Sequence, residues 1–167
     1  MRGESRRLRR RNTRIHSPIY LAIIGGEPND IGRVIMEKKT LGANTVGDTD
    51  VTYYWAEAGV EYTYKIKRPD IVPIKLEVRY AENYYTPTNV DIAIKNSIME
   101  YVNQNPYMIG QTVSGYEMAK ALNGFDQIDL LSVRVALASD ESYTDYVSFH
   151  IDQVASLEES NIEIVEV

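Results

Sequence analysis

The chain has 167 residues, of which 44% are hydrophobic and 25% are charged, and it contains no cysteine. This length allows one ordinary domain or two small ones, each with a core that needs no cross-link. The lack of cysteine excludes disulfides, a thiolate nucleophile and cysteine-based zinc or iron–sulfur sites. The longest apolar run, residues 19–24, is far shorter than the roughly 20 residues of a membrane helix. With no signal-peptide pattern either, we expect a soluble chain that is made inside the cell and does not contact membranes.

Charge is distributed unevenly along the chain. Residues 1–16 contain seven arginines and one glutamate, for a net charge of +6, whereas the remaining residues have a net charge of −12. The sequence therefore predicts a flexible basic arm, residues 1–17, before an acidic body. The arginines, with Arg9, Arg10 and Arg11 at the centre, suit contact with nucleic acid or with an acidic partner, and equally a solvated tail.

The first structured domain is expected over residues 18–68. The apolar run 19–24 ends at two glycines and predicts a central strand. The Pro-Asn-Asp sequence that follows predicts the start of a helix, in which Ile31, Val34 and Ile35 share one face.

A hairpin completes this domain in the prediction. Residues 51–55 and 60–66 read as two strands, and the Glu-Ala-Gly sequence at 57–59 predicts the turn between them. The Arg-Pro-Asp sequence at 68–70 breaks the pattern and is the expected domain boundary.

The second domain is expected over residues 69–167. Apolar and charged side chains alternate over 71–80, which predicts a strand with one buried face. A helix is expected after Pro87, with Thr88 as its cap, and apolar side chains recur along it at spacings of three or four. These are Val90, Ile94, Ile98 and Tyr101.

A second helix is predicted between residues 114 and 123, because Ser114 and Glu117 form an S-x-x-E capping box. Three strands follow in the prediction, at 130–138, 146–151 and 162–167. The order β-α-α-β-β indicates a small α+β domain with helices on one face of its sheet. The predicted fold class is therefore α+β, with two small domains that are each built on a mostly antiparallel sheet.

The sequence contains no recognisable catalytic, cofactor or metal site. Gly25 and Gly26 precede a helix but lack the spacing of a phosphate-binding loop, and a tight turn explains them. His150 and Asp152 alternate on a predicted strand without a clear third ligand, so a metal is not expected. We predict that the protein is not an enzyme and takes no cofactor, metal or small-molecule substrate.

Tyrosine dominates the aromatic residues, with 13 Tyr against two Phe and one Trp. Such rings suit interfaces, where the ring packs and the hydroxyl stays in contact with water. Because Tyr53, Tyr54 and Trp55 are consecutive on a strand, at least one ring must point away from the core. Tyr84 and Tyr85 lie near a turn. These five residues are candidate interface residues together with Arg9, Arg10 and Arg11, although ordinary packing at the rim of a small domain is an equal alternative.

Six motifs follow one another along the chain, at residues 19–35, 38–47, 67–74, 90–102, 110–114 and 162–165. In this order they resemble the baseplate J-like, or Mu-type baseplate assembly, family of contractile phage tails. The segment 19–35, IYLAIIGGEPNDIGRVI, resembles that family's strand, Gly-Gly and short helix. KKTLGANTVG at 38–47 resembles its next loop, and KRP at 67–69 with VPI at 72–74 resembles the entry to its last domain. The helix at 90–102, GQTVS at 110–114 and IEIV at 162–165 also match in order.

The resemblance implies a structural role. Such proteins are similar to the wedge component that forms the inner baseplate ring, and they associate with other copies of themselves and with neighbouring wedge proteins. It implies a place in the virion, in the tail baseplate, after assembly in the host cytoplasm. Because family members are usually longer, the chain is expected to correspond to their C-terminal part, with the arginine arm in place of the missing half. The alternative from another class is a nucleic-acid-binding accessory protein that uses this arm, although we do not expect nucleic acid as the partner of the acidic body.

Overall fold

The computed structural model describes residues 18–40 and 42–167, so the predicted arm, with Arg9, Arg10 and Arg11, lies outside the described residues. The chain forms two compact units. Unit 1 runs up to Leu21 and continues over Gly26–Lys67, and unit 2 consists of Ala22–Gly25 and Arg68–Val167. The sequence predicted the domain boundary after residue 68, whereas the two units of the structure divide before this residue. Arg68 belongs to unit 2 because its guanidinium donates hydrogen bonds to the carbonyl oxygens of Ile23 and Gly25.

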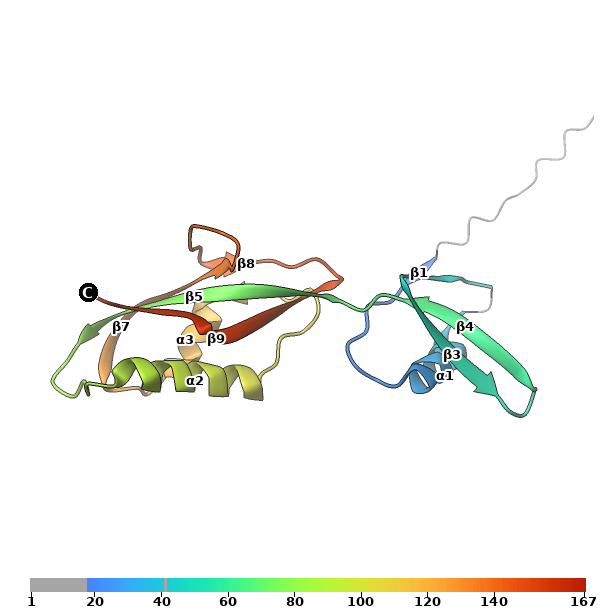
Figure 1. Ribbon diagram of the computed structural model, residues 1–167, viewed down its shortest axis with the longest axis horizontal. Coiled ribbons are helices and arrows are strands. Elements are labelled where there is room, and N and C mark those ends of the chain that lie inside the picture. Colours follow the sequence, from blue (N-terminus) through green and yellow to red (C-terminus); the bar gives the residue numbers. More distant parts are fainter. Residues whose placement is uncertain (1–17, 41) are drawn as a thin grey trace, which may run out of the picture. The chain divides into compact units, whose positions relative to one another are not determined.

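Unit 1 is a helix packed on a hairpin (Figure 1). The hairpin is formed by β3 (Thr49–Trp55) and β4 (Val60–Ile66), which pair antiparallel as the sequence predicted. The helix α1 (Pro28–Lys38) begins with the expected proline, whose fixed φ suits the first turn. Two short strands, β1 (Ile19–Tyr20) and β2 (Thr45–Val46), pair in parallel beside them.

The core of unit 1 lies between α1 and the inner face of the hairpin. Its buried side chains are Ile31, Ile35, Val51, Tyr64 and Ile66. The helix approaches β3 closely at Gly32, where a Cβ would lie 2.9 Å from the Cβ of Tyr53. A glycine therefore fixes how near α1 lies to the strand.

Two predictions for unit 1 were wrong. The run 19–24 is not a central strand, because β1 contains only Ile19 and Tyr20 and the side chain of Ile24 is 55% exposed. Val34 was expected on the buried face of the helix, but it is 47% exposed. The hairpin is too narrow to cover the whole apolar face of α1, so only Ile31, Gly32 and Ile35 are buried.

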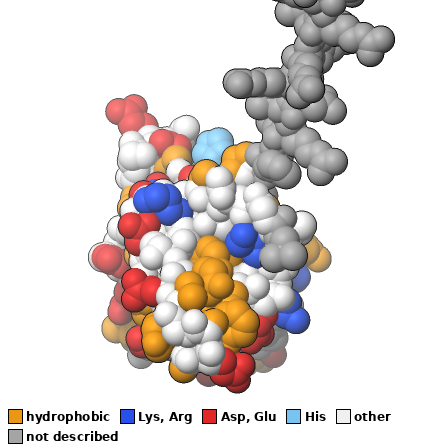
Figure 2. Space-filling view, turned by 90° about the vertical axis from the view of Figure 1, so that its right-hand side faces the viewer, with side chains coloured by type: hydrophobic (Ala, Val, Ile, Leu, Met, Phe, Trp, Pro, Cys, Tyr) orange, Lys and Arg blue, Asp and Glu red, His pale blue; other side chains and the backbone are white. Residues whose placement is uncertain are grey.

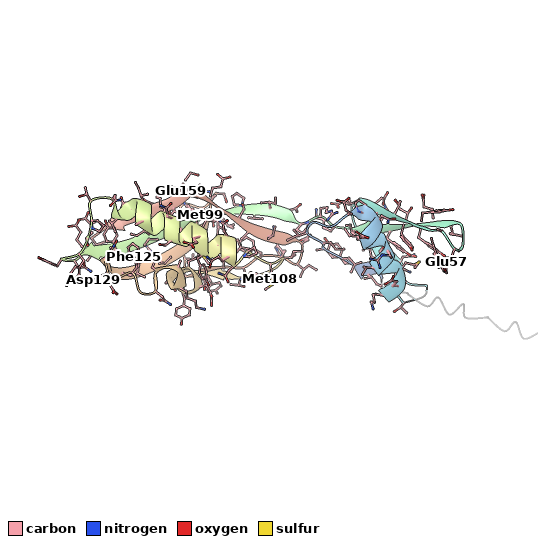
Figure 3. The ribbon with its side chains drawn as sticks, turned by 90° about the horizontal axis from the view of Figure 1, so that it is seen from below. Glu57, Met99, Met108, Phe125, Asp129 and Glu159 are labelled. Atoms are coloured by element: carbon pink, nitrogen blue, oxygen red, sulfur yellow. The ribbon has the colours of Figure 1, made fainter. Side chains whose placement is uncertain are left out.

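Unit 2 is a three-stranded sheet with helices on one face (Figures 1 and 3). The order of the strands in this sheet is β7-β5-β9. The central strand β5 (Asp70–Glu82) pairs antiparallel with β7 (Ile128–Leu137) and parallel with β9 (Gln153–Glu166). The helix α2 (Val90–Gln104) and the consecutive short helices α3 (Gly115–Ala119) and η1 (Lys120–Leu122) cover the sheet. β6 (Val113–Ser114) and β8 (Tyr146–Val147) form a separate short antiparallel pair.

The alternation of apolar and charged side chains along β5 explains the core of unit 2. Ile74, Leu76, Val78 and Tyr80 are buried against the helices, and Ile94 and Ile98 of α2 meet them in the same cluster. The spacing of three and four residues in α2 and of two residues in β5 therefore brings the apolar faces together. The α+β class predicted from the sequence is the fold of the protein.

Three details of unit 2 differ from the sequence predictions. The segment 146–151 is a strand only over β8. The last strand begins at Gln153 rather than at residue 162, and residues 158–161 are inserted between Leu157, which pairs with Ile74, and Ile162, which pairs with Leu76. This insertion of four polar residues interrupts the apolar pattern that would have marked one long strand. Thr88 is not a cap either, because α2 has Asn89 at its N-cap and no side-chain capping bond among the described residues.

Candidate interaction surfaces

The consecutive aromatic residues of unit 1 point to both faces of the hairpin. Tyr53 and Trp55 are half-buried on the face that carries α1, and Tyr54 is 57% exposed on the other face. Trp55 pairs with Val60 next to the turn, and Val60 is 42% exposed. Figure 2, viewed from the side on which the hairpin turns, shows a group of hydrophobic side chains on this face, and Figure 3 labels Glu57 in the turn.

Tyr84 and Tyr85 of unit 2 form an exposed aromatic pair. Their rings meet edge to face with centroids 5.3 Å apart, and their exposed fractions are 95% and 71%. The backbone N–H of Tyr85 donates to the side-chain oxygen of Asn83 at 2.9 Å, which fixes the turn. Tyr85 also lines a shallow hollow with Asp126 and Gln127.

The predicted interface residues belong to different parts of the chain. Tyr53, Tyr54 and Trp55 belong to unit 1, whereas Tyr84 and Tyr85 belong to unit 2. The arginines at 9–11 lie outside the described residues.

A third surface was missed from the sequence and lies within unit 2. It is a cavity of about 520 Å³ beside the outer edge of β7, called here the β7-edge groove. Three large exposed side chains line it: Tyr116 (77%), Leu131 (56%) and Tyr146 (62%). The other lining residues are Ser114, Gly115, Ala119, Leu130, Ser132, Val133 and Asp145.

Local sequence features build the walls of this groove. The hydroxyl of Ser114 accepts a hydrogen bond from the N–H of Glu117 at 3.2 Å, which confirms Ser114 as the cap and starts α3 beside β7. The other half of the predicted capping box is not formed, because the carboxylate of Glu117 accepts from Lys120 instead. Gly115 lies directly against the backbone of Val133, and its N–H donates to the carbonyl of Asp145 at 2.8 Å. These contacts hold Tyr116 and Tyr146 at the edge of the sheet.

The floor of the groove is the edge of a strand. Val135 exchanges two backbone hydrogen bonds with Thr144, of 2.9 and 2.8 Å. Before that bridge, residues 128–134 of β7 pair with β5 and with no other strand among the described residues. The pairing of β5 with β7 shifts register between Arg79 and Tyr80, and Leu131 is the residue of β7 that this shift leaves over. Its side chain therefore departs from the alternation of buried and exposed positions along β7 and stays exposed.

The sequence that forms most of unit 2 is acidic. Residues 68–167 contain 16 acidic and six basic residues. Asp145 is the charged residue that lines the groove and Asp129 lies on β7, and neither has an ion-pair partner among the described residues. Lys120 lies over the ring of Tyr116, 5.5 Å from its centroid, and its pKa is raised by hydrogen bonding to the Glu117 carboxylate.

The face of the sheet opposite the helices carries a polar network. Arg134 donates from Nε to the Glu77 carboxylate at 2.9 Å, and this carboxylate side chain is only 14% exposed. The phenol of Tyr143 donates to Glu163 at 2.8 Å, and Lys75 lies 5.0 Å from the centroid of its ring. Burial and, after it, the bond to Glu163 raise the pKa of Tyr143 to about 12. This network ties the loop after β7 to β9.

The described residues contain no group of three or more His, Cys, Asp and Glu side chains placed to hold a metal ion. His150 lies in the turn before β9 and not on a strand as predicted, and its backbone N–H donates to the side chain of Gln153. None of the described helices combines the length and the apolar character needed to cross a membrane.

The sequence signal for the groove was weak. Leu130 and Leu131 are adjacent apolar residues in the part of β7 that otherwise alternates, from Ile128 to Val135, and a bulge leaves this pattern.

Comparison of the chain with protein-family models gives no match, and comparison with curated proteins gives none either.

Proposed function

We propose that this protein is a structural component that works through protein–protein interfaces. The observation that carries the proposal is the β7-edge groove, in which Tyr116, Leu131 and Tyr146 are exposed beside a strand edge. Tyrosine is enriched in the centres of protein interfaces, and a strand edge offers backbone donors and acceptors to a partner. The exposed rings of Tyr54, Tyr84 and Tyr85 offer contact surface for neighbouring proteins rather than for another copy of the chain.

The sequence motifs support a narrower form of this proposal. Their resemblance to the baseplate J-like family points to the baseplate wedge, or inner ring, of a contractile phage tail in the virion. The partners are then other copies of the chain and neighbouring wedge proteins. No catalysis, cofactor or small-molecule substrate is part of the proposal.

Assembly is the property to measure. The full chain is expected to self-associate in sedimentation velocity, and to co-purify with the products of adjacent tail genes when they are expressed together. A chain that stays strictly monomeric and captures no tail protein contradicts the proposal.

The alternative, a nucleic-acid-binding accessory protein, makes a different prediction. Its arginine arm would shift DNA in a gel, and deletion of residues 1–16 would abolish the shift. Because phosphate contacts weaken with salt, the decisive condition is near physiological ionic strength, about 100 mM salt, where the absence of a shift excludes the alternative.

A further inference from the structure

We propose that the β7-edge groove binds the basic arm, residues 1–17, of a second copy of this chain. The inference rests on the proposed function, because it names the contact through which copies associate. Three properties of the groove support it: its free backbone, the chemistry of its side chains and its charge.

The backbone of the groove suits an extended segment. Within the described residues, residues 128–132 of β7 pair with β5 on one side and with no strand on the other, whereas Gly115 covers the backbone of Val133. Addition of a strand to such an edge is a common way to bind a peptide, because the main chain then supplies the hydrogen bonds. At roughly 3.3 Å per extended residue, 17 residues are ample to run along this edge.

The side chains of the groove suit arginine. A guanidinium stacks on an aromatic ring and also binds a carboxylate through two hydrogen bonds. Tyr116 and Tyr146 supply exposed rings, and Asp145 supplies a carboxylate within the same lining.

The apolar part of the groove fits the rest of the arm. Leu131 is 56% exposed at the groove, and the large aliphatic residues of the arm are Leu8 and Ile15. A segment with many arginines and two aliphatic side chains therefore matches a groove of two tyrosines, a leucine and an aspartate.

Net charge favours the arm over pairing between two β7 edges. The sequence that forms most of unit 2, residues 68–167, has a net charge of −10, so two such edges repel each other. The arm carries a net charge of +6 and is attracted to this surface. An arm that binds the next copy makes a head-to-tail contact, which closes into a ring or extends into a filament.

The test uses the absence of cysteine from the chain. Ile15→Cys in the full chain is labelled with a photoreactive benzophenone and mixed with full-length chain of natural sequence enriched in ¹⁵N. After irradiation, mass spectrometry maps the cross-links between the light and the heavy copy. We expect them to concentrate on α3, β8 and residues 128–133 of the heavy copy.

Matched variants of the heavy copy test whether the arm binds the groove or only the acidic surface in general. Tyr116→Ser with Tyr146→Ser removes both rings of the groove, and loss of such aromatic anchors weakens binding by about tenfold or more. Tyr84→Ser with Tyr85→Ser removes two exposed tyrosines elsewhere on unit 2 and is expected to leave the cross-link yield unchanged. Circular dichroism confirms that each variant is folded, and Leu131→Ser provides an independent groove variant.

The outcomes distinguish this inference from the proposed function. The inference is overturned if the cross-links spread over the acidic surface or occur only within the light copy. It is also overturned if the cross-link yield falls equally in the two double-tyrosine variants. If the chain nevertheless self-associates in sedimentation velocity, the proposed function stands with a different interface. If the chain neither associates nor captures tail proteins, the proposed function fails as well.

Discussion

Gly115 and Val133 are in direct contact through their backbones, because the space that a Cβ on Gly115 would need is occupied by the carbonyl oxygen of Val133. This contact places the first residue of α3 against β7 and so forms one wall of the β7-edge groove. The groove is therefore a consequence of how closely a helix can approach a strand.

Replacement of Gly115 by alanine is expected to destabilise unit 2 by about 3 kcal/mol, because a rigid backbone group must move to admit the methyl group. Chemical denaturation of the Gly115→Ala variant measures the loss. The matched control is Gly124→Ala, where the added Cβ meets no atom within 4 Å and only the positive φ of 80° is unfavourable. Its expected cost is about 1 kcal/mol, and equal losses in the two variants would contradict the steric explanation.

The cap of α3 gives a second prediction. Ser114→Ala removes the hydroxyl that accepts the N–H of Glu117 and is expected to cost about 1 kcal/mol of unfolding free energy. Thr88→Ala alters the residue that the sequence marked as a cap for α2, and the structure gives it no capping bond among the described residues. Its expected effect lies within about 0.5 kcal/mol. The same denaturation experiment compares the two, and a larger loss for Thr88→Ala would show that the caps are assigned wrongly.

The high pKa of Tyr143 gives a prediction about alkaline pH. Its folded value of about 12 lies above the usual value near 10 of a tyrosine, so the neutral phenol is favoured by folding. The resulting stability is complete below pH of about 10 and is lost as the pH rises through about 12. In an absorbance titration of tyrosinate, Tyr143→Phe is expected to remove one phenol from the high-pH phase.

Glu163→Gln tests the cause of that shift. Removal of the carboxylate that accepts the phenol hydrogen bond is expected to lower the pKa of Tyr143 only in part, because burial is the larger cause and remains. A titration identical to that of the natural sequence would show that Glu163 has no effect on the phenol.

The pair of Glu77 and Arg134 is suited to a double-mutant cycle. Arg134→Met leaves the mostly buried carboxylate of Glu77 without its partner, whereas Arg134→Met with Glu77→Gln removes the charge as well. Because Arg134 is itself 37% exposed, we expect a modest coupling energy of about 1 kcal/mol. Additive losses in the cycle would mean that the two side chains do not stabilise each other.

Periodicity predicted the elements whose apolar residues face a single core. The spacing of Ile94 and Ile98 indicated α2, and the alternation from Ile74 to Tyr80 indicated β5, and both are buried as expected. The cap at Ser114 was also confirmed, because its bond to the N–H of Glu117 joins residues three positions apart. Local patterns of this kind carry their own physical cause.

Features that depend on distant partners could not be predicted in the same way. The run 19–24 has the composition of a buried strand, but only Ile19 and Tyr20 find a strand partner, in β2. The long strand β9 was predicted only from residue 162, because four polar residues interrupt its apolar pattern before Ile162. The groove combines Tyr116, Leu131 and Tyr146 from three separate elements, and no spacing in the sequence indicates that they meet.

Sedimentation velocity of the full chain over a range of protein concentrations shows whether this chain functions by assembling with other copies and neighbouring proteins. We expect a sedimentation coefficient that rises with concentration, and a smaller rise for Tyr116→Ser with Tyr146→Ser than for Tyr84→Ser with Tyr85→Ser. A coefficient that stays at the monomer value at every concentration, both alone and with the products of adjacent tail genes, would contradict it.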